Sequence, residues 1–576
     1  MRKSGILMPV FSLPSRYGIG SFSKEAYEFV DFLKAAGQSC WQVLPMGPTS
    51  YGDSPYQSFS SFAGNPYFID LETLGEQGLL RPEYYDGMDF GCDPQQIDYV
   101  KLHEHRGRIL RMACEKFFCK FGADVQAGNR KPDRIQSGDK IFDDKTYSIK
   151  SSEGKVFEDK LSDSEKLKSI SSCKKTIIES PTVTDARINL NGADFLEFCR
   201  ENNDWLKDYA LFMVLKDLHN GKCWTQWEDA YKNRDQAALK MIAVQKREEI
   251  RFYCFEQYLF DRQWKALHAY AAENGISIIG DVPIYVALDS ADAWAQPELF
   301  QFDEERNPKA VAGCPPDAFT ATGQLWGNPL YDWPYHKKTG YAWWVRRVAH
   351  CLNLFDTVRI DHFRGFESYY SIPAGDKTAE FGHWEPGPGM DLMNTLKEKL
   401  GEVSIIAEDL GFLTDSVRQM LADSGFPGMK VLQFAFDARE ESDYLPHNYE
   451  KNSVVYTGTH DNDTTRGWYE TMSVEDRAFA VKYMNNPYTL PSGISWDFIR
   501  LAMASVSDLC VIPMQDYLCL GSEARINTPS TLGDNWKWRM LSGCLTDSLT
   551  EKIRNLTELY GRGISKKRTL ESFMDE

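Results

Sequence analysis

Short apolar runs recur along the chain, separated by stretches in which apolar residues return every three or four positions. Apolar, β-branched runs of four to eight residues are typical of buried strands, and the longer period is typical of amphipathic helices. Eight strands are expected, at Gly5–Val10, Cys40–Pro45, Ile276–Asp281, Asp356–Asp361, Val403–Glu408, Met429–Phe436, Val454–His460 and Leu509–Met514. Helices are expected between them, for example at Ala26–Ala36, Glu248–Asn274, Ala342–Leu354 and Leu413–Ser424.

Strands that alternate with helices predict an α/β fold, and eight of them predict a (β/α)8 TIM barrel. The alternative is a doubly wound open sheet. That fold usually carries a Gly-x-Gly-x-x-Gly phosphate turn after its first strand, and this chain has none. The pattern therefore favours the barrel.

The spacing of the strands is uneven, which predicts insertions into a single catalytic barrel spanning 1–576. Barrels usually carry such insertions at their C-terminal, catalytic face. A large insertion is expected after the second strand, at 46–275, with a helical block at Asp194–Leu218. Within it, about 122–191 is rich in Lys, Ser and Asp, a composition typical of disordered or weakly ordered segments. A substrate-side loop insertion is expected after the third strand, at 282–355.

Composition narrows the classes of partner. A net charge of -18 argues against nucleic acid and against an anionic membrane surface, because both need a basic face. No run reaches the roughly 18 apolar residues that span a membrane. The 13 cysteines are scattered without a Cys-x-x-Cys pair, which indicates reduced thiols in a cytoplasmic protein and no zinc site. An aromatic content of 13% suits a neutral ligand such as a sugar.

Three of the expected strands stop abruptly on an acid, at Asp361, Glu408 and Asp461. Side chains at the C-terminal ends of barrel strands point into the mouth where active sites are built. Glycosidic chemistry uses two carboxyl groups, one as nucleophile and one as general acid/base, with further groups that stabilise the transition state. The three acids therefore predict a glycosidic active site.

The residues around these acids refine the prediction. Arg359 and Asp361 lie two apart on a strand and share a face, so we expect the cation to lower the pKa of Asp361. Burial at a strand end is expected to raise the pKa of Glu408. Asp461 lies in an Asp-Asn-Asp run that lacks the Gly and distal Glu of a calcium loop, so we expect no metal. Asp281 also ends a strand, where it either orients a sugar, holds Arg359 or is structural.

Several further motifs occur in the order found in one known family. They are Ser54–Ser58, Gly64–Tyr67, Pro315–Pro329, Gln433–Asp437, Arg525–Pro529 and Asn535–Arg539. With the strand-end acids, the chain resembles the 4-α-glucanotransferases, also called amylomaltases or disproportionating enzymes, of glycoside hydrolase family 77 in the α-amylase clan. The resemblance covers nearly the whole chain except about 122–191. One departure is Ser530, which stands where the family has Gly after Asn-Thr-Pro.

The resemblance implies roles for individual residues. Asp361 matches the nucleophile, Glu408 the general acid/base and Asp461 the transition-state stabiliser. The implied contacts of the cleaved sugar are Arg359, His362, His460 and Asp281. The implied substrate-binding residues are Tyr56, Asp317, Gln324, Trp326, Asn328 and Asp437.

The implied activity is transfer of α-1,4-glucan segments between maltooligosaccharides by a retaining double displacement, without a cofactor. The loop from Pro315 to Asn328 is expected to exclude water and bind the acceptor. Two alternatives stay open. One is an α-amylase-like glucan hydrolase of the same clan, and the other is a non-catalytic glucan-binding protein.

Overall fold

Eight parallel strands close into a barrel in the computed structural model, which describes residues 2–50, 52–128, 188–316, 320–411, 413–531 and 533–563. Around the barrel the strands run β1, β2, β3, β6, β9, β10, β11 and β12, and β12 pairs with β1. Their bounds are β1 (Lys3–Leu7), β2 (Cys40–Gln42), β3 (Ser277–Val282), β6 (Thr357–Ile360), β9 (Ile405–Ala407), β10 (Gly428–Val431), β11 (Ser453–Tyr456) and β12 (Leu509–Pro513). All eight predicted strands and the predicted TIM barrel are confirmed.

Alternating side chains of the strands fill the barrel, as expected where one face of each strand points inward. A separate apolar cluster occupies the interior, formed by Leu7, Cys40, Ile279, Ile406, Met429, Val431, Val454, Tyr456 and Val511. Strand β6 contributes no residue to this cluster. Its Arg359 stands in register with Asp281 on one side and Ile406 on the other. The barrel therefore carries a charged group in an interior that is otherwise largely apolar.

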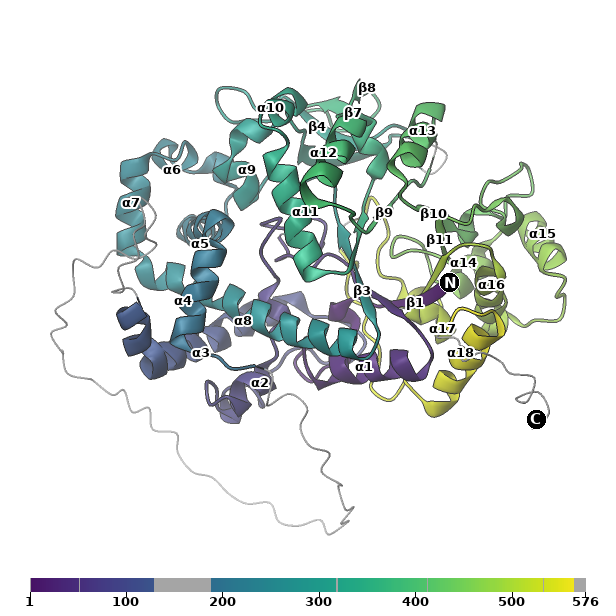
Figure 1. Cartoon of the computed structure of the whole chain (residues 1–576), viewed down its shortest axis with the longest axis horizontal. Coiled ribbons are helices and arrows are strands. Elements are labelled where there is room, and N and C mark those ends of the chain that lie inside the picture. Colours follow the sequence, from purple (N-terminus) through teal and green to yellow (C-terminus); the bar gives the residue numbers. More distant parts are fainter. Residues whose placement is uncertain are drawn as a thin grey trace, which may run out of the picture.

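Helices surround the barrel, and neighbouring ones pack side by side (Figure 1). The outer helices are α1 (Lys24–Ala35), α8 (Arg247–Glu273), α11 (Ala342–Leu354), α12 (Met390–Leu400), α13 (Asp415–Ser424), α14 (Thr465–Thr471), α15 (Val474–Met484), α16 (Ile494–Ala504), α17 (Met514–Tyr517) and α18 (Asp547–Leu559). The predicted helices at α1, α8, α11 and α13 are confirmed within two residues. Within the described residues, no helix combines the length and the apolar character needed to cross a membrane.

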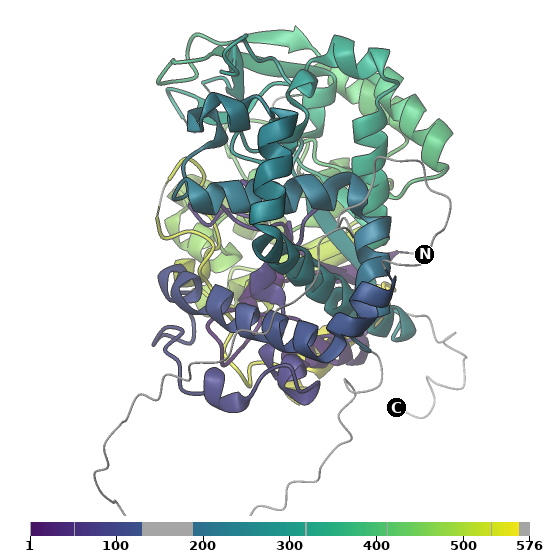
Figure 2. The ribbon, with the colours of Figure 1, turned by 90° about the vertical axis from the view of Figure 1, so that its left-hand side faces the viewer.

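Further helices fill the region between β2 and β3, and they lie together on one side of the molecule (Figures 1 and 2). They are α2 (Leu71–Glu76), α3 (Tyr99–Gly128), α4 (Gly192–Glu201), α5 (Asn203–Leu218), α6 (Asp229–Lys232) and α7 (Gln236–Gln245). The predicted helical block Asp194–Leu218 is two helices. Asn202 separates them by using its side chain, which donates to the carbonyl of Phe198 and accepts from the indole of Trp205.

The predicted low-complexity segment, 122–191, lies largely outside the described residues. Residues 122–128 continue helix α3, and 188–191 lead into helix α4. The prediction for 129–187 concerns residues that the structure does not describe.

A second, antiparallel sheet lies at the top of Figure 1, in the order β5, β4, β7, β8. Its strands are β4 (Ala310–Cys314), β5 (Gln324–Pro329), β7 (Ser368–Pro373) and β8 (His383–Pro386). The prediction for 282–355 was a loop insertion that ends in a helix at Ala342–Leu354. That region contains β4, β5, α9 (Ala291–Ala295), α10 (Trp333–Lys338) and α11, and the region after β6 supplies the other two strands.

Candidate active site

Asp361, Glu408 and Asp461 all follow the C-terminal ends of barrel strands, β6, β9 and β11 respectively. Oε2 of Glu408 accepts a hydrogen bond of 2.6 Å from the backbone N–H of His362, the residue after Asp361. Asp361 is close enough to Glu408 and to Asp461 for their charges to interact. The three acids predicted from the sequence are therefore brought together at one end of the barrel.

Arg359 connects two carboxylates inside the barrel. Its Nη1 lies 2.7 Å from both carboxylate oxygens of Asp281, and its Nη2 lies 3.0 Å from Oδ1 of Asp361. Tyr56 donates a hydrogen bond of 2.9 Å to Oδ2 of Asp281. Asp281 thus holds Arg359, which was one of the three alternatives left open by the sequence. A planar guanidinium suits this bridge because it presents several donors in a fixed geometry.

The predicted contact between Arg359 and Asp361 is present, but the expected net effect on the pKa of Asp361 is wrong. Burial raises that pKa, and the neighbouring charge of Asp281 adds to the increase. Arg359 lowers it but does not compensate, so the pKa of Asp361 is about 6. The sequence indicated the cation but not how strongly burial raises the pKa of this carboxyl group.

Glu408 is held in an environment that favours its protonated form. Burial and the nearby charge of Asp361 raise the pKa of Glu408 to about 7. The backbone N–H groups of His362 and Leu410 each donate to one of its carboxyl oxygens, at 2.6 and 2.9 Å. Glu408 therefore has a fixed orientation, in an environment that favours the protonated carboxyl group.

Asp461 has the opposite electrostatic character. Burial raises its pKa, but the charge of His460 and hydrogen bonds from His460 and Asn527 outweigh burial and lower it to about 2. Asn527 donates a hydrogen bond of 2.6 Å to Oδ1, and Arg525 donates to the backbone carbonyl of Asp461 at 2.7 Å. Asn527 and Arg525 were not predicted as site residues, although the Arg525–Pro529 motif was a signal that contained both.

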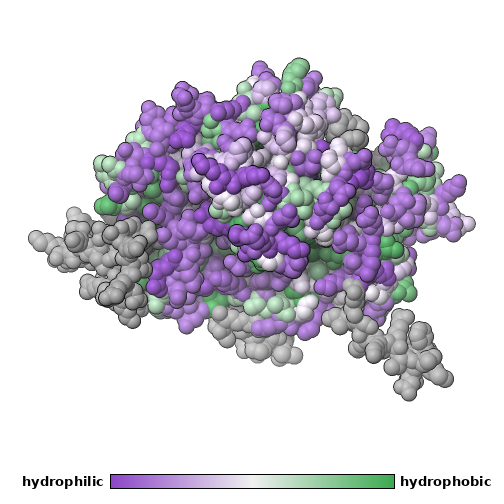
Figure 3. Space-filling model, turned by 45° about the horizontal axis from the view of Figure 1, so that its top comes forward, coloured by the Kyte–Doolittle hydropathy of each residue, from purple (hydrophilic) through white to green (hydrophobic). Residues whose placement is uncertain are grey.

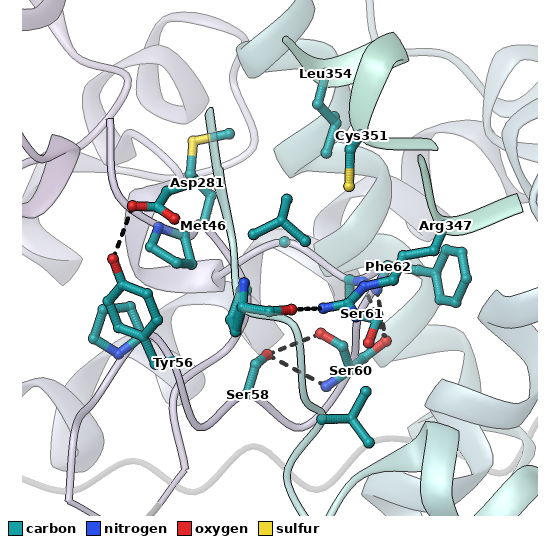
Figure 4. A pocket seen from close by; sticks show the side chains of 18 of the residues that line it. Met46, Tyr56, Ser58, Ser60, Ser61, Phe62, Asp281, Arg347, Cys351 and Leu354 are labelled. Carbon is teal, nitrogen blue, oxygen red and sulfur yellow. Dashed lines mark hydrogen bonds between the residues drawn. The ribbon is translucent and has the colours of Figure 1, made fainter. Parts of the chain in front are cut away.

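Aromatic side chains line one side of the site. The ring of Tyr56 stacks on His460 at 5.0 Å between centroids, and Trp536 lies against both rings. Figure 4 shows the Tyr56 hydroxyl directed at Asp281 beside a cavity of about 70 Å³. The cavity is also lined by Met46, Ser58, Ser60, Phe62, Arg347, Cys351 and Leu354. The predicted contacts Tyr56, Asp281, Arg359 and His460 thus form one connected group.

His362 combines backbone strain with a buried ring nitrogen. Its φ of 53° lies in the left-handed region, where non-glycine residues are uncommon and often functional. Burial lowers the pKa of its imidazole to about 3, so the ring is neutral. Its buried Nε2 has no hydrogen-bond partner among the described residues, and Trp326 contacts the ring edge-on at 4.9 Å. This nitrogen is suited to a sugar hydroxyl.

The predicted loop residues differ in the hydrogen bonds that their side chains make within the protein. Trp326 donates from its indole to Oε1 of Gln324 at 3.0 Å, which leaves the Gln324 amide nitrogen for other contacts. Asn328 is buried and uses both ends of its amide, donating to the carbonyl of Val286 and accepting from Gln57. Asn328 therefore fixes β5 against its neighbours. Asp317 lies outside the described residues.

Asp437 is engaged by a charged partner. Both of its carboxylate oxygens accept from the guanidinium of Arg439, at 2.8 and 2.6 Å. These hydrogen bonds lower the pKa of Asp437 to about 2.

Among the described residues, no group of three His, Cys, Asp or Glu side chains is arranged to hold a metal ion.

The loop after Pro529 takes the shape that glycine favours. Ser530, which stands where the resembled family has Gly, has a φ of 63° in the left-handed region. The loop therefore keeps a glycine-like backbone conformation despite the serine.

Comparisons with known proteins identify the family of the chain. The family model described as 4-alpha-glucanotransferase, of glycoside hydrolase family 77, matches residues 8–133 and 144–545. The 4-alpha-glucanotransferase of Clostridium butyricum is 44% identical over 557 residues, covering 96% of this chain and 100% of that protein. The chloroplastic/amyloplastic 4-alpha-glucanotransferase of Solanum tuberosum is 37% identical, covering 97% of this chain and 86% of that protein.

A solved structure, the amylomaltase from Streptococcus agalactiae in complex with acarbose, is 37% identical with a TM-score of 0.84. The match covers 98% of this chain and 100% of that one. Because the family model and these relatives extend over nearly the whole length, the chain belongs to the 4-alpha-glucanotransferase family, glycoside hydrolase family 77.

Proposed function

We propose that this chain transfers α-1,4-glucan segments from a maltooligosaccharide or starch-like donor to the 4-hydroxyl of another glucan or of glucose. The reaction is a retaining double displacement. Its central pair is Asp361, the nucleophile, and Glu408, the general acid/base. Membership of the family supports the activity, and the site geometry supports the roles.

In the first step, the carboxylate of Asp361 attacks the anomeric carbon of the donor as the glycosidic C–O bond breaks. The proton of Glu408 passes to the departing 4-oxygen, and a covalent glycosyl ester remains on Asp361. In the second step, the acceptor 4-hydroxyl gives its proton to Glu408 and attacks the same carbon. The ester bond breaks, Asp361 is restored, and one glycosidic bond has replaced another with retention of configuration.

The observation that carries these roles is the placement of the two carboxyl groups. The backbone N–H of His362, the residue after Asp361, donates to Oε2 of Glu408 at 2.6 Å, and Arg359 lies 3.0 Å from Asp361. Arg359 favours the ionised form of Asp361, whereas burial and the charge of Asp361 raise the pKa of Glu408 and favour its protonated form, as the first step requires. Retention also predicts that the two carboxyl groups lie about 5–5.5 Å apart in the complex with substrate.

Two further groups support the transition state. Asp461 stays ionised at neutral pH because of His460 and Asn527, and it can oppose the positive charge that develops on the sugar ring. The neutral His362 can bond a sugar hydroxyl through its Nε2, which has no partner among the described residues.

We propose a cytoplasmic location, which is supported by the twelve cysteines of the described residues, all of them free thiols.

The proposal is tested by incubating the purified protein with maltotriose alone. Transfer predicts glucose together with a ladder of longer maltooligosaccharides, at a constant total of reducing ends. An increase in reducing ends with only shorter products would mean an α-amylase-like hydrolase. The Glu408→Gln variant is the control. An enzyme should lose its activity on this substitution, whereas a non-catalytic glucan-binding protein would leave maltotriose unchanged in both forms.

A further inference from the structure

One tryptophan of the chain is exposed. All 15 tryptophans lie in the described residues, and 14 of them are buried or half-buried. Trp384, on strand β8, is 39% exposed. Tryptophan has a large apolar surface that folding normally removes from water, and an indole that stays exposed while its neighbours hold it in place is available to a ligand.

The ring of Trp384 is held in place by its surroundings. The guanidinium of Arg364 lies 3.9 Å from the ring centroid, and the ring of Tyr370 contacts it at 5.2 Å with 63° between the planes. Tyr370 stands directly opposite Trp384 in the pairing of β7 with β8. A ring fixed in this way loses little conformational freedom when a ligand stacks on it.

Trp384 is also connected to the active site. Arg364 lies two residues after His362 and three after Asp361, in the segment that follows β6. Strand β5 of the same sheet carries Trp326, whose ring contacts His362. The sheet therefore reaches from the reacting centre to the exposed indole.

We propose that Trp384 is a remote sugar-binding subsite, on which a glucose ring of a long α-1,4-glucan stacks while the chain reacts between Asp361 and Glu408. The inference rests on the proposed function and deepens it. An aromatic face that carries no net charge fits the apolar face of a neutral sugar. The face of the molecule that includes the top of Figure 1 is largely hydrophilic, with hydrophobic residues in small scattered groups (Figure 3). The described residues on this face therefore form no large apolar patch of the kind that marks a protein-docking surface.

A remote subsite has a specific kinetic consequence. Short donors such as maltotriose fill the sites around the scissile bond without reaching Trp384, so their reaction does not depend on it. Long donors gain one aromatic contact that is present equally in the ground state and the transition state. Uniform binding of this kind changes KM and leaves kcat unaltered.

The test compares the Trp384→Ala variant with the wild type on maltotriose and on amylose. The KM for amylose is expected to rise by about fivefold to tenfold, the loss typical of one aromatic contact. The kcat on amylose and both constants on maltotriose are expected to stay within about twofold. The Trp384→Phe variant is expected to recover most of the loss, because it restores a ring at the same position.

The control is Tyr488→Ala, which removes an aromatic ring that is 90% exposed in the connection between α15 and α16, far from β8 in Figure 1. This variant is expected to keep the wild-type KM and kcat on both maltotriose and amylose. An unaltered KM for amylose in Trp384→Ala would overturn the inference, as would equal losses on both substrates, which would mean that Trp384 only supports the Arg364 segment. Failure of the wild type to redistribute maltotriose would instead overturn the proposed function.

Discussion

The backbone N–H of His362 donates a hydrogen bond of 2.6 Å to Oε2 of Glu408, across the gap between strands β6 and β9. Because His362 directly follows Asp361, this bond sets the position of one carboxyl group relative to the other. His362 makes this hydrogen bond while its backbone is in the left-handed region, with a φ of 53°. Strain at this position is consistent with a backbone selected for the geometry of the pair.

The pH dependence of activity should follow the two carboxyl groups. As pH falls through about 6, Asp361 becomes protonated and the nucleophile is lost. As pH rises through about 7, Glu408 loses the proton that the first step needs. We therefore expect a bell-shaped profile of kcat/KM on maltotriose, with its maximum between these values. A profile that is flat from pH 5 to pH 9 would contradict the assignment of the pair.

Replacing Arg359 by Lys should misplace the carboxylates of Asp281 and Asp361 while keeping the positive charge. A single ammonium group cannot reproduce the contacts of 2.7 Å to Asp281 and 3.0 Å to Asp361. We expect kcat to fall on the order of 100-fold, the effect of a small misplacement of reacting groups. The acidic limb of the pH profile should move to higher pH, because an ammonium group held farther from Asp361 lowers the pKa of Asp361 less than Arg359 does.

The matched control for this substitution is Arg562→Lys. Arg562 is also buried, but it bonds backbone carbonyls such as that of Met503, away from the acids. It should lower thermal stability and leave the pH profile in place. If both variants moved the profile alike, the effect of Arg359 would not be specific.

Asn527→Ala should weaken catalysis through Asp461. The amide of Asn527 donates at 2.6 Å to this carboxylate and helps to lower its pKa. Loss of one hydrogen bond to a charged group predicts a fall in kcat/KM of about tenfold to 100-fold, measured on maltotriose. Asn448→Ala removes an amide hydrogen bond to the carbonyl of Ser442 and should have no such effect. Full activity of the Asn527 variant would refute the positioning role.

Trp326→Ala should shift the balance between transfer and hydrolysis. The indole packs edge-on against His362 and is bonded to Gln324, so its removal opens the site to water. We expect the ratio of transfer to hydrolysis to fall about tenfold, measured by product separation and reducing-end assay. Trp496→Ala, which removes a half-buried indole from α16, is the control. An unaltered ratio and rate would mean that the loop does not exclude water.

Gly280→Ala should destabilise the barrel. A Cβ at this position in β3 would lie 2.1 Å from the ring of Phe355, which is packed in the core. Overpacking of this kind costs on the order of 2–3 kcal/mol in the free energy of unfolding, measured by urea denaturation. Gly107→Ala, in open space within helix α3, should instead stabilise by about 0.5–1 kcal/mol. Equal effects of the two variants would contradict the packing argument.

The barrel strands could be predicted because each is a short run of apolar residues, and that local composition is enough to indicate a buried strand. Strands β4, β5, β7 and β8 were missed for a physical reason. Their sheet is assembled from two separate insertions, and residues such as Trp384 and Leu325 remain exposed on it. No regular apolar pattern therefore marks these segments.

The acids of the site were likewise visible as strand ends, whereas their electrostatic balance was not. The pKa of Asp361 depends on burial by elements from the whole chain, which no local pattern reports. The engagement of Asn328 with Val286 and Gln57 also depends on tertiary contacts. Sequence motifs thus predicted the three strand-end acids and Arg359, which lie together in the structure, and left open how each is used.

The central claim is that Asp361 forms a covalent glycosyl intermediate, and trapping that intermediate tests it most directly. The Glu408→Gln variant would be mixed with α-glucosyl fluoride, whose leaving group needs no general acid, and then digested and analysed by mass spectrometry. We expect one glucosyl group on the peptide that contains Asp361, and no such label in the Asp361→Asn, Glu408→Gln double variant. A label on another residue, or fluoride release with inversion and no labelled peptide, would contradict the account.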